Sequence, residues 1–218
     1  MSTKKTGERV ITFPNPPSII GFASVAGKKE GEGPLGNSFD YVSEDTTFGE
    51  KSWEKAESLM QHKALELALA KAKISAGDLD CICAGDLINQ CVASSFGIRG
   101  MDAAFLGLYG ACSTMAESAI ISSLLIDGGF SDYAAAVTSS HFASAERQYR
   151  FPLEYGGQRT PTAQWTVTGA GCMILSSSGT GPYITKACIG KIVDYGVKDA
   201  NNMGAAMAPA AHQNTQYR

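Results

Sequence analysis

Hydrophobic residues along the chain fall into short unbroken runs and into longer segments in which they recur every three or four positions. Short runs flanked by turn residues are typical of buried strands, and the spaced segments are typical of helices. The runs predict strands at residues 11–26, 81–85, 103–109, 133–137, 171–175 and 183–193.

Two helices are predicted between these strands. The first begins after Ser52, whose hydroxyl can cap it, and ends before Gly77. Its apolar stripe consists of Trp53, Ala56, Met60, Ala64 and Leu67. The second begins at a capping-box pattern formed by Thr114 and Glu117 and ends at the glycine pair 128–129.

The alternation of strands and helices predicts the fold class. Strands that are connected through helices tend to run in the same direction, so they build a largely parallel sheet with helices packed on it. We therefore expect an α/β protein. The sequence shows no internal repeat and no low-complexity linker that would divide it.

Composition and charge argue against several function classes. Of the 218 residues, 44% are hydrophobic and 18% are charged, so the chain can bury a core and is not expected to be disordered. A formal net charge of -3 provides no basic surface for nucleic acid or for an anionic membrane.

The first residues lack the apolar stretch of a secretory signal, so the six cysteines are expected to be reduced thiols. The C-x-C spacing of Cys81 and Cys83 differs from the C-x-x-C pairs of zinc sites, and neither a metal nor a cofactor is expected.

Cys112 is the residue whose position has the clearest chemical consequence. An apolar strand ends at Tyr109, a Gly-Ala turn follows, and Cys112 comes shortly before the helix that begins at Thr114. The N–H groups and the positive end of a helix can stabilise a thiolate or hold the carboxylate of a ligand. Ligands of α/β sheets bind at the carboxyl ends of strands, where Cys112 and Ser113 are expected to lie. The alternative is that Cys112 only fills space in the core.

Three further polar residues follow predicted strands and are candidates for the same crevice. Asp86 and Asn89 come after the strand that ends at residue 85, and His141 comes after the strand that begins at Tyr133. Asp86 could instead cap the next helix, and His141 could have a capping or hydrogen-bonded structural role.

Several segments resemble one known family. The Ala-Cys-Ser turn at 111–113, the helix end at 125–129 and the segment 166–175 resemble the amino-terminal half of the thiolase and ketoacyl-synthase superfamily. More specifically, the chain resembles the stage V sporulation protein AD family of endospore-forming bacteria. The segments that carry this likeness are Glu30–Gly36, Ala84–Gln90, Tyr109–Thr114, Thr138–His141, Ala145–Gln148, Glu154–Gly157, Pro161–Gly171 and Met203–Ala210.

The resemblance implies a thiolase-like fold, as the amino-terminal half of a layered αβαβα architecture. It also implies a noncatalytic protein that binds dipicolinic acid, pyridine-2,6-dicarboxylic acid, either free or as its calcium chelate. We expect the ligand to be bound by Asp86, Asn89, Cys112, Ser113 and His141. Asp86 would favour the calcium chelate over free dipicolinate, because its carboxylate repels the dianion and can bind the metal. The implied partners are membrane proteins of the same sporulation operon and a second copy of the chain. The implied location is the forespore cytoplasm, at the inner spore membrane.

Family members continue into a second, similarly folded half. Here residues 1–180 are expected to form the amino-terminal half, and residues 181–218 are expected to begin a truncated second half. Two other functions stay open. The first is an acyl-transfer enzyme with Cys112 as its nucleophile, and the second is an assembly scaffold with a vestigial pocket.

Overall fold

The structure is a computed structural model that describes residues 4–6, 9–149, 166–199, 202 and 204–215. Its strands are β1 (Lys5–Thr6), β2 (Val10–Thr12), β3 (Ser18–Ala26), β4 (Tyr41–Val42), β5 (Cys81–Gly85), β6 (Ala104–Gly107), β7 (Tyr133–Ser140), β8 (Gly169–Ser176) and β9 (Lys186–Cys188). Its α-helices are α1 (Lys28–Gly31), α2 (Trp53–Ala72), α3 (Val92–Ile98), α4 (Thr114–Asp127), α5 (Phe142–Tyr149) and α6 (Gly204–Thr215). Short 3-10 turns are η1 (Gly36–Ser38), η2 (Ala76–Asp78), η3 (Asn89–Cys91) and η4 (Ala111–Ser113).

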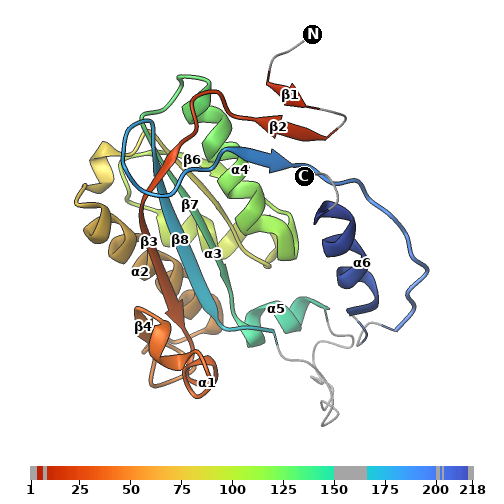
Figure 1. Cartoon of the computed structure of the whole chain (residues 1–218). Coiled ribbons are helices and arrows are strands. Elements are labelled where there is room, and N and C mark those ends of the chain that lie inside the picture. Colours follow the sequence, from red (N-terminus) through yellow and green to blue (C-terminus); the bar gives the residue numbers. More distant parts are fainter. Residues whose placement is uncertain (1–3, 7–8, 150–165, 200–201, 203, 216–218) are drawn as a thin grey trace.

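A six-stranded sheet forms the centre of the fold (Figure 1), and its strand order is β4-β3-β8-β7-β5-β6. β8 runs antiparallel to its neighbours β3 and β7, and the other neighbouring pairs are parallel. The predicted α/β class is therefore confirmed, and the sheet is largely parallel with one reversed strand in its middle. The short strands β1, β2 and β9 form a second, antiparallel sheet.

Helices cover both faces of the large sheet. Along β5, Ile82 and Ala84 join the cluster that α2 completes, whereas Cys83 is not part of that cluster and lies next to Ser122 of α4. This alternation follows from the two-residue period of a strand, which sends neighbouring side chains to opposite faces. Every residue of β5 is buried, which explains why the sequence shows an unbroken apolar run instead of polar and apolar alternation.

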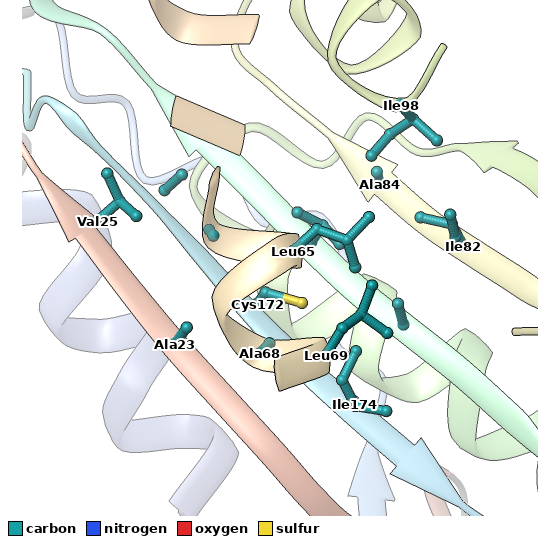
Figure 2. Packing of buried hydrophobic residues seen from close by; sticks show 14 of the residues in the cluster. Ala23, Val25, Leu65, Ala68, Leu69, Ile82, Ala84, Ile98, Cys172 and Ile174 are labelled. Carbon is teal, nitrogen blue, oxygen red and sulfur yellow. The ribbon is translucent and has the colours of Figure 1, made fainter. Parts of the chain in front are cut away.

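The main core lies between α2 and the sheet (Figure 2). Leu65 and Leu69 of α2 are 0% and 6% exposed, and their cluster includes Ile174 of β8 and Val25 of β3. Burying a leucine side chain of this size contributes about 2 kcal/mol to folding. The helix begins as predicted, because the hydroxyl of Ser52 accepts a hydrogen bond from the backbone N–H of Lys55.

Two predicted strands differ from the observed ones. The region 11–26 forms two strands, β2 and β3, because Pro14, Pro16 and Pro17 between them have no N–H group to donate to a sheet. The strand expected over 183–193 is limited to β9, and Ile192 beyond it is fully exposed. The domain boundary expected at residue 180 stays a prediction.

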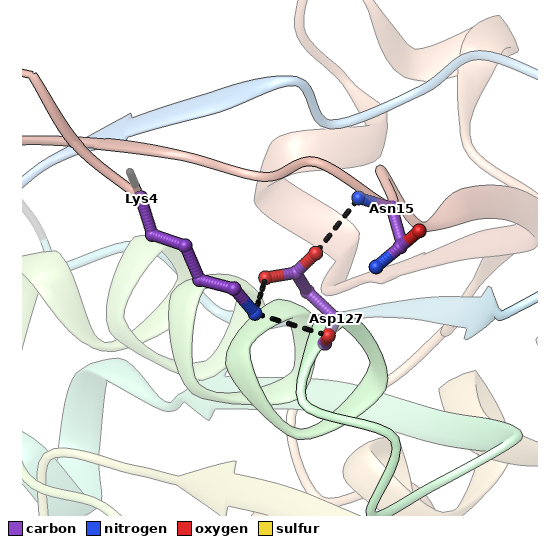
Figure 3. A network of polar contacts seen from close by, with 3 residues as sticks. All are labelled: Lys4, Asn15 and Asp127. Carbon is purple, nitrogen blue, oxygen red and sulfur yellow. Dashed lines mark hydrogen bonds and ion pairs between the residues drawn. The ribbon is translucent and has the colours of Figure 1, made fainter. Parts of the chain in front are cut away.

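Asp127, the last residue of α4, connects this helix to the start of the chain (Figure 3). Its Oδ2 atom lies 2.7 Å from the ammonium group of Lys4, and its Oδ1 atom accepts a hydrogen bond of 2.8 Å from the N–H of Asn15. The negative end of a helix disfavours a carboxylate, and these two contacts offset that effect. Burial raises the pKa of Asp127, but the contacts with Lys4 and Asn15 outweigh burial and lower the pKa below its ordinary value.

Candidate functional site

The carboxyl ends of β5, β6 and β7 lie at one edge of the sheet, because β5 pairs in parallel with both of the other strands. The residues predicted to form the site follow these three ends. Asp86 and Asn89 follow β5, Cys112 and Ser113 follow β6, and His141 follows β7. The topology thus brings all five to the strand ends at which α/β proteins bind ligands.

The turn before α4 presents Cys112 to solvent. Cys112 and Ser113 are exposed, whereas Cys81, Cys83, Cys91 and Cys172 are buried. Ala111, which precedes Cys112, has a left-handed backbone with a φ of 47°, a conformation that residues other than glycine rarely adopt. The alternative in which Cys112 fills space in the core is therefore wrong.

Thr114 stabilises this turn instead of forming the predicted capping box. Its hydroxyl donates to the carbonyl of Ala111 at 2.8 Å and accepts from the N–H of Gly110 at 3.1 Å. The N-cap residue of α4 is Ser113, and no side chain caps the helix there. The prediction failed because the threonine hydroxyl is already used inside the turn.

Asp86 is buried, and both oxygens of its carboxylate accept hydrogen bonds from other residues of the chain. Its Oδ1 atom accepts from the N–H of Ile88 at 2.8 Å, and its Oδ2 atom accepts from the N–H and the hydroxyl of Ser94 at 2.8 and 2.6 Å. Ser94 lies in the first turn of α3, so Asp86 caps that helix from a distance in sequence. With 1% of its surface exposed, Asp86 does not offer an oxygen to a metal ion in solvent. The capping alternative fits this geometry.

His141 is also buried and is held by backbone groups on both sides of its ring. Its Nδ1 atom accepts from the N–H of Ala143 at 3.1 Å, so the ring proton lies on Nε2, which donates to the carbonyl of Thr46 at 2.7 Å. Burial lowers the pKa of His141, which keeps the ring neutral. A cavity of about 250 Å³ lies beside this turn and is lined by Phe142 and Thr168, among other residues. The hydrogen-bonded structural role fits this arrangement.

Asn89 lies on an exposed loop that contacts the turn of Cys112. Gln90 and Cys91 after it have left-handed backbones with φ values of 63° and 51°. The thiol of Cys91 donates to the carbonyl of Leu108 at 3.3 Å, which joins the loop after β5 to the loop after β6. Of the five predicted residues, Asn89, Cys112 and Ser113 are thus exposed, and Asp86 and His141 are buried.

Sequence reasoning missed two buried polar residues of α2 that lie next to these loops. Glu57 and Gln61 are both 0% exposed. The amide of Gln61 donates to the carbonyl of Gly85, and Glu57 accepts hydrogen bonds from Ser139 and Ser144. A signal was present, because both residues continue the stripe of Leu65 along the helix at four-residue spacing.

Two further functional features are absent from the described part of the chain. It contains no group of three or more His, Cys, Asp or Glu side chains that could hold a metal ion. No helix within it is long and apolar enough to cross a membrane. The first five residues of the segment Pro161–Gly171, which carries part of the family resemblance, lie outside the described ranges.

Solved structures with a similar course of the chain include two proteins of low sequence identity. The 3-oxoacyl-(acyl-carrier-protein) synthase III of Aquifex aeolicus VF5 is 17% identical, and the match covers 75% of this chain and 55% of that one with a TM-score of 0.46. The OleA protein of Xanthomonas campestris is 17% identical, and the match covers 76% of this chain and 59% of that one with a TM-score of 0.49. At this level the likeness says nothing about the chemistry of the site.

Sequence comparison gives a much stronger match. Residues 7–217 match the family model described as stage V sporulation protein AD. The stage V sporulation protein AD of Bacillus subtilis (strain 168) is 44% identical over 208 residues, which are 95% of this chain and 62% of that protein. The chain therefore spans less than two thirds of the length of this curated relative. On the strength of both matches, the chain belongs to the stage V sporulation protein AD family.

Proposed function

We propose that the chain binds dipicolinate at the ends of β5, β6 and β7 and that it does so without catalysis. Membership of the sporulation family supports this proposal, and one observation carries it. Cys112 is exposed at the site, yet both ring nitrogens of His141 are engaged by backbone groups. A nucleophilic cysteine is commonly activated by a base within hydrogen-bonding reach, and His141 is not available for that role. An exposed thiol without this base is better suited to contact a ligand than to transfer an acyl group.

Charge supports the same proposal. The helix α4 has 14 residues, and its positive end lies directly after Cys112 and Ser113, where it favours a ligand carboxylate. Asn89 lies on the neighbouring exposed loop and can donate from its amide to the second carboxylate. The buried carboxylate of Asp86 repels a dianion, so a calcium chelate, which carries less negative charge, is expected to bind more tightly than free dipicolinate.

Calorimetric titration of dipicolinate, with and without calcium, tests this proposal. We expect saturable heat, and we expect the Cys112→Leu variant to bind at least about tenfold more weakly, because a loss of about 1.4 kcal/mol corresponds to that factor. Cys188→Leu is the matched control, since Cys188 is a partly exposed cysteine on another strand. A folded chain that gives no heat with either form of the ligand would contradict the proposal.

Acyl transfer is the alternative function, and mass analysis separates it from binding. A transferase would form a thioester on Cys112 when it is incubated with acyl-coenzyme A, and the Cys112→Ala variant would lack this adduct. We expect no adduct.

An assembly scaffold, in contrast, would bind its membrane partners equally well when the pocket is altered. We propose that the membrane proteins of the same operon bind this chain at the inner spore membrane and work with it to load the ligand into the developing spore.

We also propose that two copies of the chain pair along β6. This strand is at the edge of the sheet, and its four residues are exposed, including Phe105 and Leu106. An edge strand with free backbone groups and apolar side chains favours pairing with another strand. Light scattering is expected to show a dimer for the wild type and a monomer for Phe105→Lys. Phe130→Lys, at a strongly exposed position outside β6, should stay dimeric, and a monomeric wild type would refute the pairing.

A further inference from the structure

Two buried carboxyl groups near the carboxyl ends of β5 and β7 are connected by a chain of hydrogen bonds. Glu57 of α2 and Asp86 after β5 are 0% and 1% exposed. Ser139 donates to Glu57 Oε1 at 3.0 Å, and Ser94 donates to Asp86 Oδ2 at 2.6 Å. The amide nitrogen of Gln61 lies 3.3 Å from the Ser139 hydroxyl and 3.1 Å from the Ser94 hydroxyl. One glutamine amide therefore joins both carboxyl groups through two serines.

The number of available protons fixes the direction of these bonds. The Nε2 atom of Gln61 can only donate, and its two protons face three acceptors, namely the hydroxyls of Ser139 and Ser94 and the carbonyl of Gly85 at 3.2 Å. In any bond between this amide and one of the two serines, the serine is therefore the acceptor. Each serine hydroxyl has a single proton, and the geometry directs that proton to the carboxyl group on its far side. Glu57 and Asp86 thus both receive hydrogen bonds from the same amide-centred network, and a change at one of them can reach the other.

Ser144 connects Glu57 to the turn of His141. Its hydroxyl lies 2.6 Å from Glu57 Oε2 and 3.2 Å from the carbonyl of His141. The single proton of the Ser144 hydroxyl cannot form a full hydrogen bond to both the Glu57 carboxylate and the His141 carbonyl. If Glu57 carries a proton on Oε2, that proton is donated to Ser144, and Ser144 can then donate to the carbonyl of His141. Ionised Glu57 thus takes the Ser144 proton and leaves the His141 carbonyl with its bond from the N–H of Ala145, whereas protonated Glu57 frees the Ser144 proton for a second bond to that carbonyl.

Burial and the charges around Glu57 favour its protonated form. Burial raises its pKa to about 7, the hydrogen bonds from Ser144 and Ser139 oppose this, and the negative charges of Asp86 and Glu54 raise the pKa further. His141 on the adjoining turn is buried, and its own pKa is lowered, so it supplies no positive charge near neutral pH. An additional anion at the crevice acts in the same direction as Asp86.

We propose that Glu57 is a positioning residue that links ligand binding to a proton: when an anionic ligand binds at the crevice, Glu57 takes up a proton from solvent on Oε2. This inference rests on the proposed function and specifies how that site is regulated. The proton strengthens the bonds from Glu57 through Ser144 to the His141 turn, and it removes a negative charge from behind the ligand. Binding of dipicolinate is thereby tighter at lower pH.

Calorimetry of dipicolinate binding in buffers of different ionisation enthalpy measures the proton uptake directly. For the wild type we expect uptake of a fraction of a proton near pH 7, and an affinity that falls about three- to tenfold from pH 6 to pH 8. The Glu57→Gln variant is expected to bind dipicolinate without proton uptake, and its affinity should change by less than about twofold between pH 6 and pH 8. Glu44→Gln is the matched control, because Glu44 is exposed, and it should behave as the wild type does.

The outcomes separate this inference from the proposed function. Heat of binding without proton uptake, or uptake that persists in Glu57→Gln, overturns the role of Glu57 and leaves dipicolinate binding intact. Absence of heat at every pH overturns both. If Glu57→Gln does not fold, Ser144→Ala replaces it. Removing the Ser144 hydroxyl takes away a bond that lowers the pKa of Glu57, so the pH of greatest uptake should rise, and an unchanged pH would refute the inference.

Discussion

Adding a single methyl group at Gly85 is expected to lower the free energy of unfolding by about 3 kcal/mol. Gly85 ends β5, and a Cβ atom there would lie 2.1 Å from the carbonyl oxygen of Leu108 and 2.5 Å from Cγ2 of Thr114. Leu108 cannot easily retreat, because its N–H donates to the carbonyl of Ala84 at 2.8 Å. The Gly85→Ala variant must therefore displace the turn that carries Cys112 or disrupt the end of β5.

Urea unfolding followed by circular dichroism measures this loss. Gly77→Ala is the control, because Gly77 is exposed and the nearest atom to its added Cβ is the Ser75 hydroxyl oxygen, 3.9 Å away. We expect this control to change the free energy of unfolding by less than about 0.5 kcal/mol. Equal stabilities of the two variants would mean that the turn of Cys112 is not packed against β5 as the structure describes.

The sequence predicted those features that depend on local pattern. The apolar run at 81–85 is β5, and Ser52 caps α2 as its hydroxyl suggested. Thr114 shows the limit of such reasoning. It has the right neighbours for a capping box, but its hydroxyl is used by Gly110 and Ala111, and this depends on the left-handed turn that precedes α4.

The five candidate residues lie at the strand ends, as their places in the sequence predict, but their individual roles could not be assigned from the sequence. The position of a residue directly after a strand does not show whether its side chain points to solvent or into the protein interior. Asp86 points inward to the N–H of Ser94, and Asn89, only three residues later, is exposed. Glu57 was missed because a charged residue on a helix is usually solvated. Its burial depends on Ser139 and Ser144, which are far away in sequence.

The free energy of unfolding is expected to fall as the pH rises from about 5 to 7, and the Glu57→Gln variant is expected to lack this contribution. Burial raises the pKa of Glu57 from 4.5 in the unfolded chain to about 7 in the folded one. Between these values the folded state holds a proton that the unfolded state has released, so stability is lost as the pH rises. The separation of the two pKa values corresponds to about 3 kcal/mol.

Other titrating groups affect stability at different pH values or with the opposite sign. Contact with Lys71 lowers the pKa of Asp40, so its contribution is lost only when the pH falls into the acid range. Burial lowers the pKa of His141, so its contribution rises with pH up to about 6.5 and partly hides that of Glu57 in the wild type.

The difference between the wild type and Glu57→Gln removes this overlap, because His141 and Asp40 are present in both proteins. Urea unfolding at several pH values between about 5 and 8 gives that difference, which should grow in favour of the variant until about pH 7 and then stay constant. Glu44→Gln, at an exposed position, should follow the wild type throughout. Parallel curves for the wild type and Glu57→Gln would show that the buried carboxyl group does not titrate in this range. The proton invoked for ligand binding would then have to come from another residue.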